Sequence, residues 1–96
     1  MMVVSMLQIV VELPETTSLK EKRRIVVAIK DRLRSKFRLS CAEIDLLDSI
    51  RFAHIGAALV SNSRRHGEAV MQKALAFVED GFSLRVHDSQ IHSEQY

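Results

Sequence analysis

Apolar residues of this chain recur at every second position in some stretches and at three- and four-residue spacing in others. A period of two is typical of strands, and the longer spacing is typical of helices. The pattern predicts one helix from Ser18 to Arg38 and another that starts after Asn62 and Ser63 and stops before Gly81. The expected strands are residues 1–12, 39–45, 52–61 and 83–91, and residues 92–96 are expected to form a loose tail.

Two of these strands are apolar on both faces. The core faces are expected to be Val3, Leu7, Ile9 and Val11 in the first strand, and Ala53, Ile55, Ala57 and Leu59 in the third. The opposite faces also carry apolar side chains, at Val4, Met6, Val10, Phe52, Ala58 and Val60. Such strands lie in the centre of a sheet, or their second face is covered by a partner. In residues 39–45 the apolar positions change parity, which predicts a β-bulge.

The helix ends carry recognisable capping residues. Ser18 and Glu21 form a capping box, in which each side chain accepts from the other residue's backbone amide. Lys22 falls on the core face but in the first turn, so its ammonium group is expected to reach water. Gly81 is expected to adopt a left-handed conformation just past the second helix, with Phe82 packing back on Phe77.

The predicted order of elements is β-α-β-β-α-β. Two β-α-β halves with their helices on one face give a ferredoxin-like α+β sandwich, expected here as a single domain over residues 1–96. The right-handed crossover rule places the first and third strands in the centre of the sheet. The chain has no apolar run long enough to span a membrane. Its one cysteine, Cys41, cannot form an intrachain disulfide and fits a cytoplasmic setting.

Positive charge is concentrated in the first helix. Between Leu19 and Arg38 the chain carries nine basic and two acidic residues, a net charge of +7. The whole chain has 14 basic and 12 acidic residues, a net charge of +2, so the rest of the chain carries −5. This separation of charge favours an anionic partner.

A stripe of cations follows helical spacing on one side of that helix. Such a stripe can neutralise the phosphates of a nucleic-acid backbone, or it can be a solvated face that keeps the protein soluble. The chain has only four Phe and one Tyr, so base stacking is not expected to contribute. The candidate nucleic-acid-binding residues are Lys20, Arg23, Arg24, Lys30, Arg34 and Arg38.

Other polar clusters carry weaker signals. Ser63 to His66 could hold a phosphate at the start of the second helix, or its arginines could simply be solvated. Glu43, Asp45 and Asp48 could bind Mg²⁺ or act as an acid/base pair, or they could pair with Arg51 or the basic helix. The four histidines do not form a ligand set, and Cys41 is interpreted as a small core residue. We assign no catalytic residue, metal or cofactor.

Several motifs resemble those of the small bacterial YlxP-like family, which is uncharacterised. They are SLKEKRR at residues 18–24, AEID at residues 42–45 with the following Asp48, and VSNS with His66. The resemblance spans nearly the whole chain and implies a ferredoxin-like fold. Genes of that family often lie near those for translation initiation and ribosome maturation, which implies a ribosome- or RNA-linked role. Members commonly carry Asp and an aromatic residue where this chain has Ser63 and Ile50.

Three functional interpretations follow from these observations. The first is a non-enzymatic binding protein that contacts RNA or a ribosomal particle through the basic helix. The second is a homo-oligomeric interaction module, expected as a homodimer, that acts through the apolar sheet face at Val4, Met6, Val10, Phe52, Ala58 and Val60. The third is a small metal-dependent enzyme that uses Asp45 and Asp48.

Overall fold

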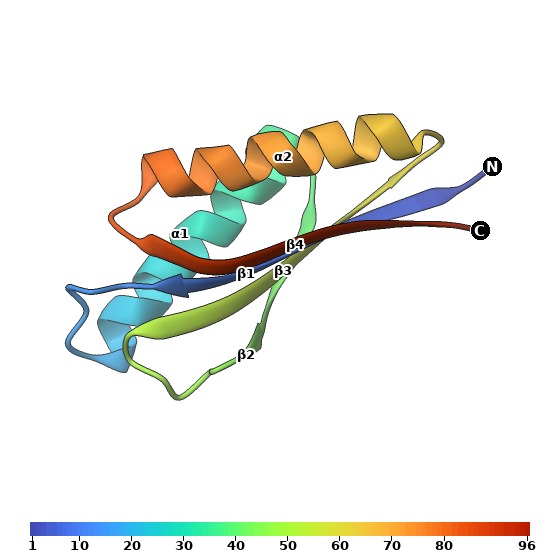
Figure 1. Ribbon diagram of the computed structural model, residues 1–96. Coiled ribbons are helices and arrows are strands. Elements are labelled where there is room, and N and C mark those ends of the chain that lie inside the picture. Colours follow the sequence, from blue (N-terminus) through green and yellow to red (C-terminus); the bar gives the residue numbers. More distant parts are fainter.

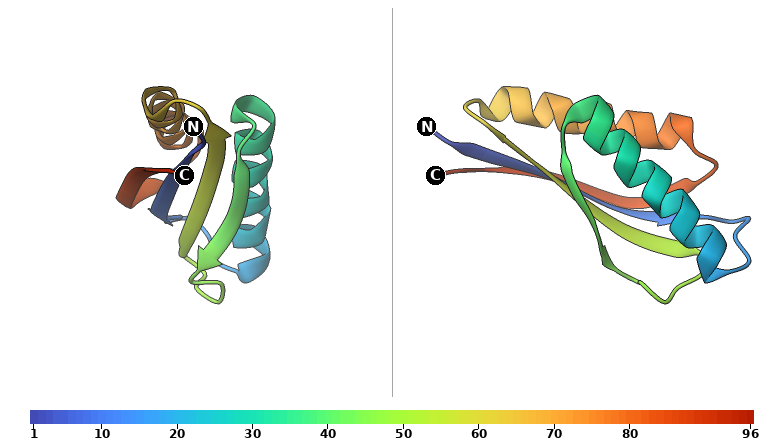
Figure 2. Two further views of the ribbon diagram at one scale, coloured as in Figure 1. Left: turned by 90° about the vertical axis from the view of Figure 1, so that its right-hand side faces the viewer. Right: turned by 180° about the vertical axis from the view of Figure 1, so that it is seen from behind.

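The computed structural model describes residues 1–96 as an antiparallel sheet with two helices on one of its faces (Figures 1 and 2). The order of elements is the predicted β-α-β-β-α-β. The elements are β1 (Val3–Glu12), α1 (Leu19–Phe37), β2 (Ser40–Asp45), β3 (Phe52–Ser61), α2 (Arg64–Gly81) and β4 (Arg85–Gln95).

The strands are ordered β2-β3-β1-β4, and every neighbouring pair is antiparallel. β1 pairs along its whole length with β3 on one side and with β4 on the other, so β1 and β3 are the central strands, as the crossover rule predicts. This arrangement is that of an α+β ferredoxin-like sandwich, which confirms the fold predicted from the sequence. Neither helix is long and apolar enough to cross a membrane.

The sheet has one buried face and one open face. In β1 the odd positions are buried under the helices and the even positions are only half-buried, and β3 shows the same alternation up to Ala58. The helices complete the core with the stripes Val26, Ile29 and Leu33 from α1 and Met71, Ala74 and Val78 from α2. The expected core faces of both strands and both helices are therefore confirmed in outline, with Leu59 only partly buried.

The first helix begins and ends close to the expected residues. Ser18 is the N-cap, and its Oγ accepts from the Glu21 amide at 3.1 Å. The returning bond is shifted by one residue, because the Glu21 carboxylate accepts from the backbone N–H of Thr17 at 2.9 Å instead of from Ser18. At the other end Arg38 lies outside the helix in the left-handed region, with φ 58°, and its N–H closes the last turn on Arg34.

The expected conformation of Gly81 is wrong. No glycine of this chain has a positive φ, and Gly81 is the last residue of α2 itself, followed by an extended Phe82. Phe82 nevertheless packs on Phe77 as expected, with ring centroids 6.2 Å apart. The aromatic contact therefore forms without the left-handed turn that usually accompanies it.

This correction reverses the expected effect of Gly81→Ala. A left-handed residue would make the substitution destabilising, but a helical glycine with no neighbouring atom within 4 Å of its missing Cβ has room for a methyl group. We expect the variant to be more stable by about 0.5 kcal/mol, because alanine restricts the unfolded chain and favours the helix. Urea unfolding measures this change, and a lower midpoint would contradict the helical assignment.

The expected loose tail is also wrong, because residues 92–95 belong to β4. Their partners lie at the start of β1, and the Tyr96 N–H donates to the Met2 carbonyl at 2.7 Å. The first and last residues of the chain therefore lie side by side, where they project together from one end of the sheet (Figure 1). The predicted bulge in β2 is confirmed, between Glu43 and Asp45.

Candidate functional site

Most basic side chains of α1 have no carboxylate partner. Of the nine between Leu19 and Arg38, only Lys22 and Arg34 have a nitrogen within 4.0 Å of a carboxylate oxygen. Among the six candidate residues, Lys30 is half-buried and the other five are exposed. We call these six residues the basic stripe: Lys20, Arg23, Arg24, Lys30, Arg34 and Arg38.

The basic stripe approaches the edge strand β2 at Lys30 and Arg34, whereas Arg24 lines a small pocket with Glu15 and Ser83. Arg34 donates a hydrogen bond from Nη2 to the Cys41 carbonyl at 2.8 Å, and its Nη1 lies 3.6 Å from Asp31. Burial raises the pKa of the Cys41 thiol, and the nearby charges of Arg34 and Lys30 oppose this effect. Arg34 therefore also attaches the helix to β2, which the sequence pattern did not indicate.

The two remaining cations of the last turns lie on the other side of the helix. Arg32 stacks over the Phe82 ring at 5.6 Å, and Lys36 lies 5.3 Å from the centre of the Phe77 ring. Each cation is attracted to the electron-rich face of an aromatic ring. These side chains connect α1 to α2 and are separate from the basic stripe.

Lys22 does not reach water, which corrects the prediction. Its side chain is 1% exposed, and its ammonium group lies 3.0 Å from Oε2 of Glu43 and donates to the Leu46 carbonyl at 2.6 Å. Glu43 is 14% exposed, and its buried Oε2 accepts no well-aligned hydrogen bond, so the contact is mainly ionic. The lysine thus ties α1 to β2 and to the loop that follows.

Two of the three acidic candidates near β2 have separate contacts within the chain, and the third, Asp48, is exposed. The Glu43 carboxylate faces Lys22, and Oδ1 of Asp45 accepts from the backbone N–H of Leu46 at 2.8 Å. Leu46 has a left-handed conformation with φ 62°, an uncommon state that its hydrogen bonds to Lys22 and Asp45 help to hold. No group of three or more His, Cys, Asp and Glu side chains is arranged to hold a metal ion.

The start of α2 is also occupied by intramolecular contacts. Ser63 is the N-cap, and its Oγ accepts from the His66 amide at 3.1 Å. Arg64 donates from Nη1 to the Ser93 carbonyl of β4 at 2.6 Å. The hydroxyl and one of the two guanidinium groups that the sequence offered to an anion are therefore engaged within the protein.

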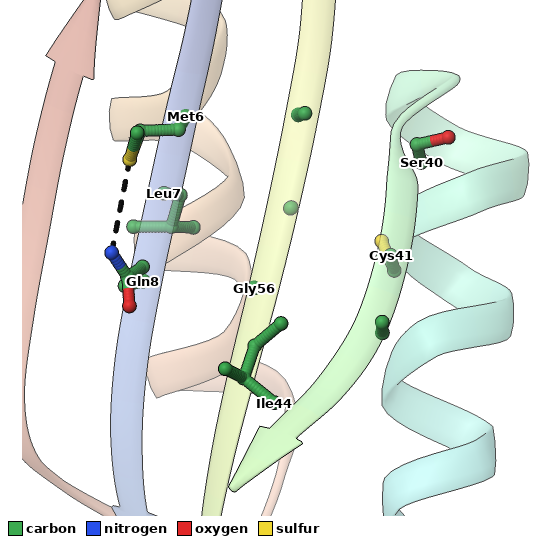
Figure 3. Close-up of a pocket in the computed structure, with 10 residues that line it drawn as sticks. Met6, Leu7, Gln8, Ser40, Cys41, Ile44 and Gly56 are labelled. Atoms are coloured by element: carbon green, nitrogen blue, oxygen red, sulfur yellow. Dashed lines mark hydrogen bonds between the residues drawn. The ribbon is translucent and has the colours of Figure 1, made fainter.

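A shallow apolar groove of about 490 Å³ lies in the open face of the sheet (Figure 3). Its floor is made by small residues where β2, β3 and β1 run side by side. Gly56 lets the Ile44 side chain lie directly over β3, because a Cβ atom there would be 2.9 Å from that side chain and would displace it. The residues of the open face that line the groove include Met6, Gln8, Ala42, Ile44, Gly56 and Ala58.

The residues predicted to form an oligomer interface share this open face. Val4, Met6, Val10, Phe52 and Ala58 are half-buried, and Val60 is 65% exposed. The polar pair His54 and Gln8 interrupts them in the middle, with Nε2 and Oε1 2.9 Å apart. The structure thus brings the six predicted residues to one surface.

Two carboxylates at the β4 side of the sheet are paired with histidines. Glu12 lies 2.9 Å from His87, and the hydrogen bond from the imidazole holds the pKa of the carboxyl below its usual value. Glu94 lies 2.7 Å from His92, and its pKa is lowered for the same reason. Sequence spacing did not predict these pairs, because the bond between Glu12 and His87 joins two strands, and Glu94 and His92 lie in the segment that was expected to be a loose tail.

Fold and sequence together define the class of this protein: a small ferredoxin-like α+β domain with a basic helix and an apolar open sheet face. The chain belongs to the family described as protein of unknown function (DUF503), whose match covers residues 4–91. It is also similar to the "Uncharacterized protein YlxP" of Bacillus subtilis (strain 168), with 40% identity over 62 residues, 65% of this chain and 67% of that protein. The resemblance found in the sequence motifs is therefore confirmed.

Proposed function

We propose that this protein is a non-enzymatic binding protein that contacts RNA, alone or in a ribosomal particle, through the phosphate backbone. The basic stripe on α1 is the binding surface. The observation that carries the proposal is that Lys20, Arg23, Arg24, Lys30 and Arg38 have no carboxylate within 4.0 Å. Their charge is free to neutralise an external anion.

The geometry of the helix suits a line of phosphates. A helix of 19 residues is about 28 Å long at ~1.5 Å per residue, and the stripe extends along most of this length. Arginine and lysine on one helix side can contact several successive phosphates and release their counterions. The negative charge on the rest of the chain orients the molecule with this side toward the nucleic acid.

The contacts are expected to be with phosphates and sugars more than with bases. Stacking platforms need exposed aromatic rings, but Phe37, Phe77 and Phe82 pack against one another and against Arg32 and Lys36. Phe52 packs on His87, and the one strongly exposed ring, Tyr96, lies at the end of the chain next to β4 and not on α1. Binding through the backbone alone carries little sequence information. Affinity should therefore depend weakly on RNA sequence and strongly on salt.

A charge-reversal pair tests this proposal. We expect Lys20→Glu/Arg23→Glu to lower the affinity for single-stranded and duplex RNA at least tenfold at low salt. Single neutral substitutions in the stripe should also change the salt dependence of binding. The slope of log affinity against log salt concentration should become shallower by about one for each phosphate that the protein no longer neutralises. Both residues are exposed and lie in the first turns of α1, where glutamate suits the helix dipole, so the fold should be retained.

The matched control reverses two exposed cations on α2. Arg65→Glu/Lys73→Glu changes the net charge by the same amount, away from the basic stripe. We expect this control to bind much more tightly than the stripe variant. Equal losses in both variants would show a general charge effect, and no binding of the wild-type protein to RNA, duplex DNA or ribosomal particles at low salt would refute the proposal.

A further inference from the structure

The open face of the sheet presents more apolar surface than its strands need for their own packing. Large side chains at its two extremes are strongly exposed, with Val60 at 65% and Ile44 at 53%. Met2 and Tyr96, paired next to Val60 at the end where the termini meet, are 47% and 71% exposed. An apolar band therefore crosses the face from the chain ends to β2, and contiguous exposed apolar surface is typical of interaction sites.

The same face carries both a hollow and protruding side chains. The hollow is the groove over Ala42, Gly56 and Ala58, where small residues leave space beside Ile44. Val60 and Met2 protrude nearby, on the same face of β3 and β1. A surface with both features can fit a copy of itself across a two-fold axis, because each protrusion then enters the hollow of the other copy.

The size of the face matches a dimer interface. Two strands of ten residues, one of eleven and one of six, at ~4.8 Å spacing and ~3.3 Å per residue, give a flat area of about 600 Å². Specific interfaces bury about 600–1,000 Å² on each partner. Two sheets can pack face to face at a separation of about 10 Å with interdigitated side chains, as in a β-sandwich.

Most charged groups on the face already have a partner. Glu12 and Glu94 at its β4 side are bound to His87 and His92. The central polar pair, Gln8 and His54, is hydrogen-bonded within the chain. Asp88 lies opposite Val10 on the edge strand β4 without a cation partner, so we expect it to stay at the rim of the contact, in water. The rest of the face can be covered at a lower electrostatic cost than the charged helix side.

We propose that the open face binds a second copy of this chain as a two-fold sandwich, with the Val60 end of each copy in the groove of the other. The sheets meet in the middle, and α1 and α2 of both copies lie on the outside. Both basic stripes remain accessible in such a dimer. The inference does not depend on RNA binding, because it concerns the opposite face of the sheet.

Sedimentation equilibrium of the full chain at micromolar concentrations tests the proposal. We expect the wild-type protein to have twice the 10.9 kDa chain mass and Val60→Glu to dissociate at least 100-fold more readily, because the new carboxylate is buried without a partner. Val27→Glu is the matched control, since Val27 is 49% exposed on α1, away from the open face. We expect this control to remain dimeric.

Thiol labelling at position 42 locates the interface. Ala42 lies opposite Gly56 on the open face, whereas the Cys41 side chain packs toward the helices, so Cys41→Ser/Ala42→Cys places the only thiol in the groove. Its reaction with a maleimide should slow as protein concentration rises and should not slow when Val60→Glu is added. A wild-type monomer at all concentrations would overturn the proposal. So would a dimer that survives Val60→Glu, or a dimer in which labelling at position 42 is independent of concentration.

Discussion

Lys22→Met is expected to destabilise the protein by about 3 kcal/mol, because it removes one partner of a buried ion pair. Methionine has a similar length and keeps the packing of the first turn of α1, so the loss is electrostatic. Glu43 would keep its charge at a side chain that is only 14% exposed, and the Leu46 carbonyl would lose its donor. Urea unfolding followed by circular dichroism measures the change.

Two further variants separate the ion pair from its surroundings. Lys20→Met, at an exposed position two residues earlier, should change stability by less than about 0.5 kcal/mol. Lys22→Met/Glu43→Leu should recover part of the loss, because apolar replacement of both partners leaves no unpaired charge. If Lys22→Met were as stable as the wild-type protein, the buried position of the ammonium group would be wrong.

Gly67→Ala is expected to cost about 3 kcal/mol, the opposite sign from Gly81→Ala. Gly67 lies in α2 directly over β1, and an added Cβ would clash with Oγ of Ser5 and lie 2.9 Å from its Cβ. Ser5 is fully buried and shares a 2.8 Å hydrogen bond with Ser93 of β4. The new methyl group therefore forces either an overpacked helix or the loss of a buried hydrogen bond.

A double variant identifies the clash as the cause. Ser5→Gly removes both atoms that the new methyl group would clash with and leaves only Ser61 Oγ, at an ordinary contact distance of 3.6 Å. Ser5→Gly/Gly67→Ala should therefore be more stable than the sum of the single changes predicts, by at least ~1 kcal/mol. Thermal and urea unfolding of all four proteins complete the cycle. Strict additivity would show that the helix and strand are not in the close contact described here.

The element order, the central strands and the buried faces were predictable because they follow from local periodicity. The same holds for the caps at Ser18 and Ser63, since capping depends on residues within one turn. The family resemblance followed from motifs in those same local segments. The end of the first helix was predicted one residue too late. Arg38 is the left-handed residue that follows the helix, but left-handed positions are usually recognised by a glycine, and none stands there.

The features that the sequence did not predict depend on contacts that local periodicity does not describe. Lys22 was correctly placed on the core face, but its burial depends on Glu43 and on the Leu46 carbonyl, about twenty residues away. Residues 92–95 read as a polar tail because their pattern is weakly apolar, yet pairing with β1 orders them. The second role of Arg34, at the Cys41 carbonyl seven residues later, was missed because it depends on how β2 packs beside α1.

The pairing of β1 with β4 has a consequence for how the chain acquires its structure during synthesis. The central strand is made first, but one of its two edges stays open until the final strand has been translated. During that interval an apolar strand presents unpaired backbone groups, which is the state most prone to aggregation. Contacts so distant in sequence also slow folding, so we expect nascent chains to depend on timely release or on chaperones.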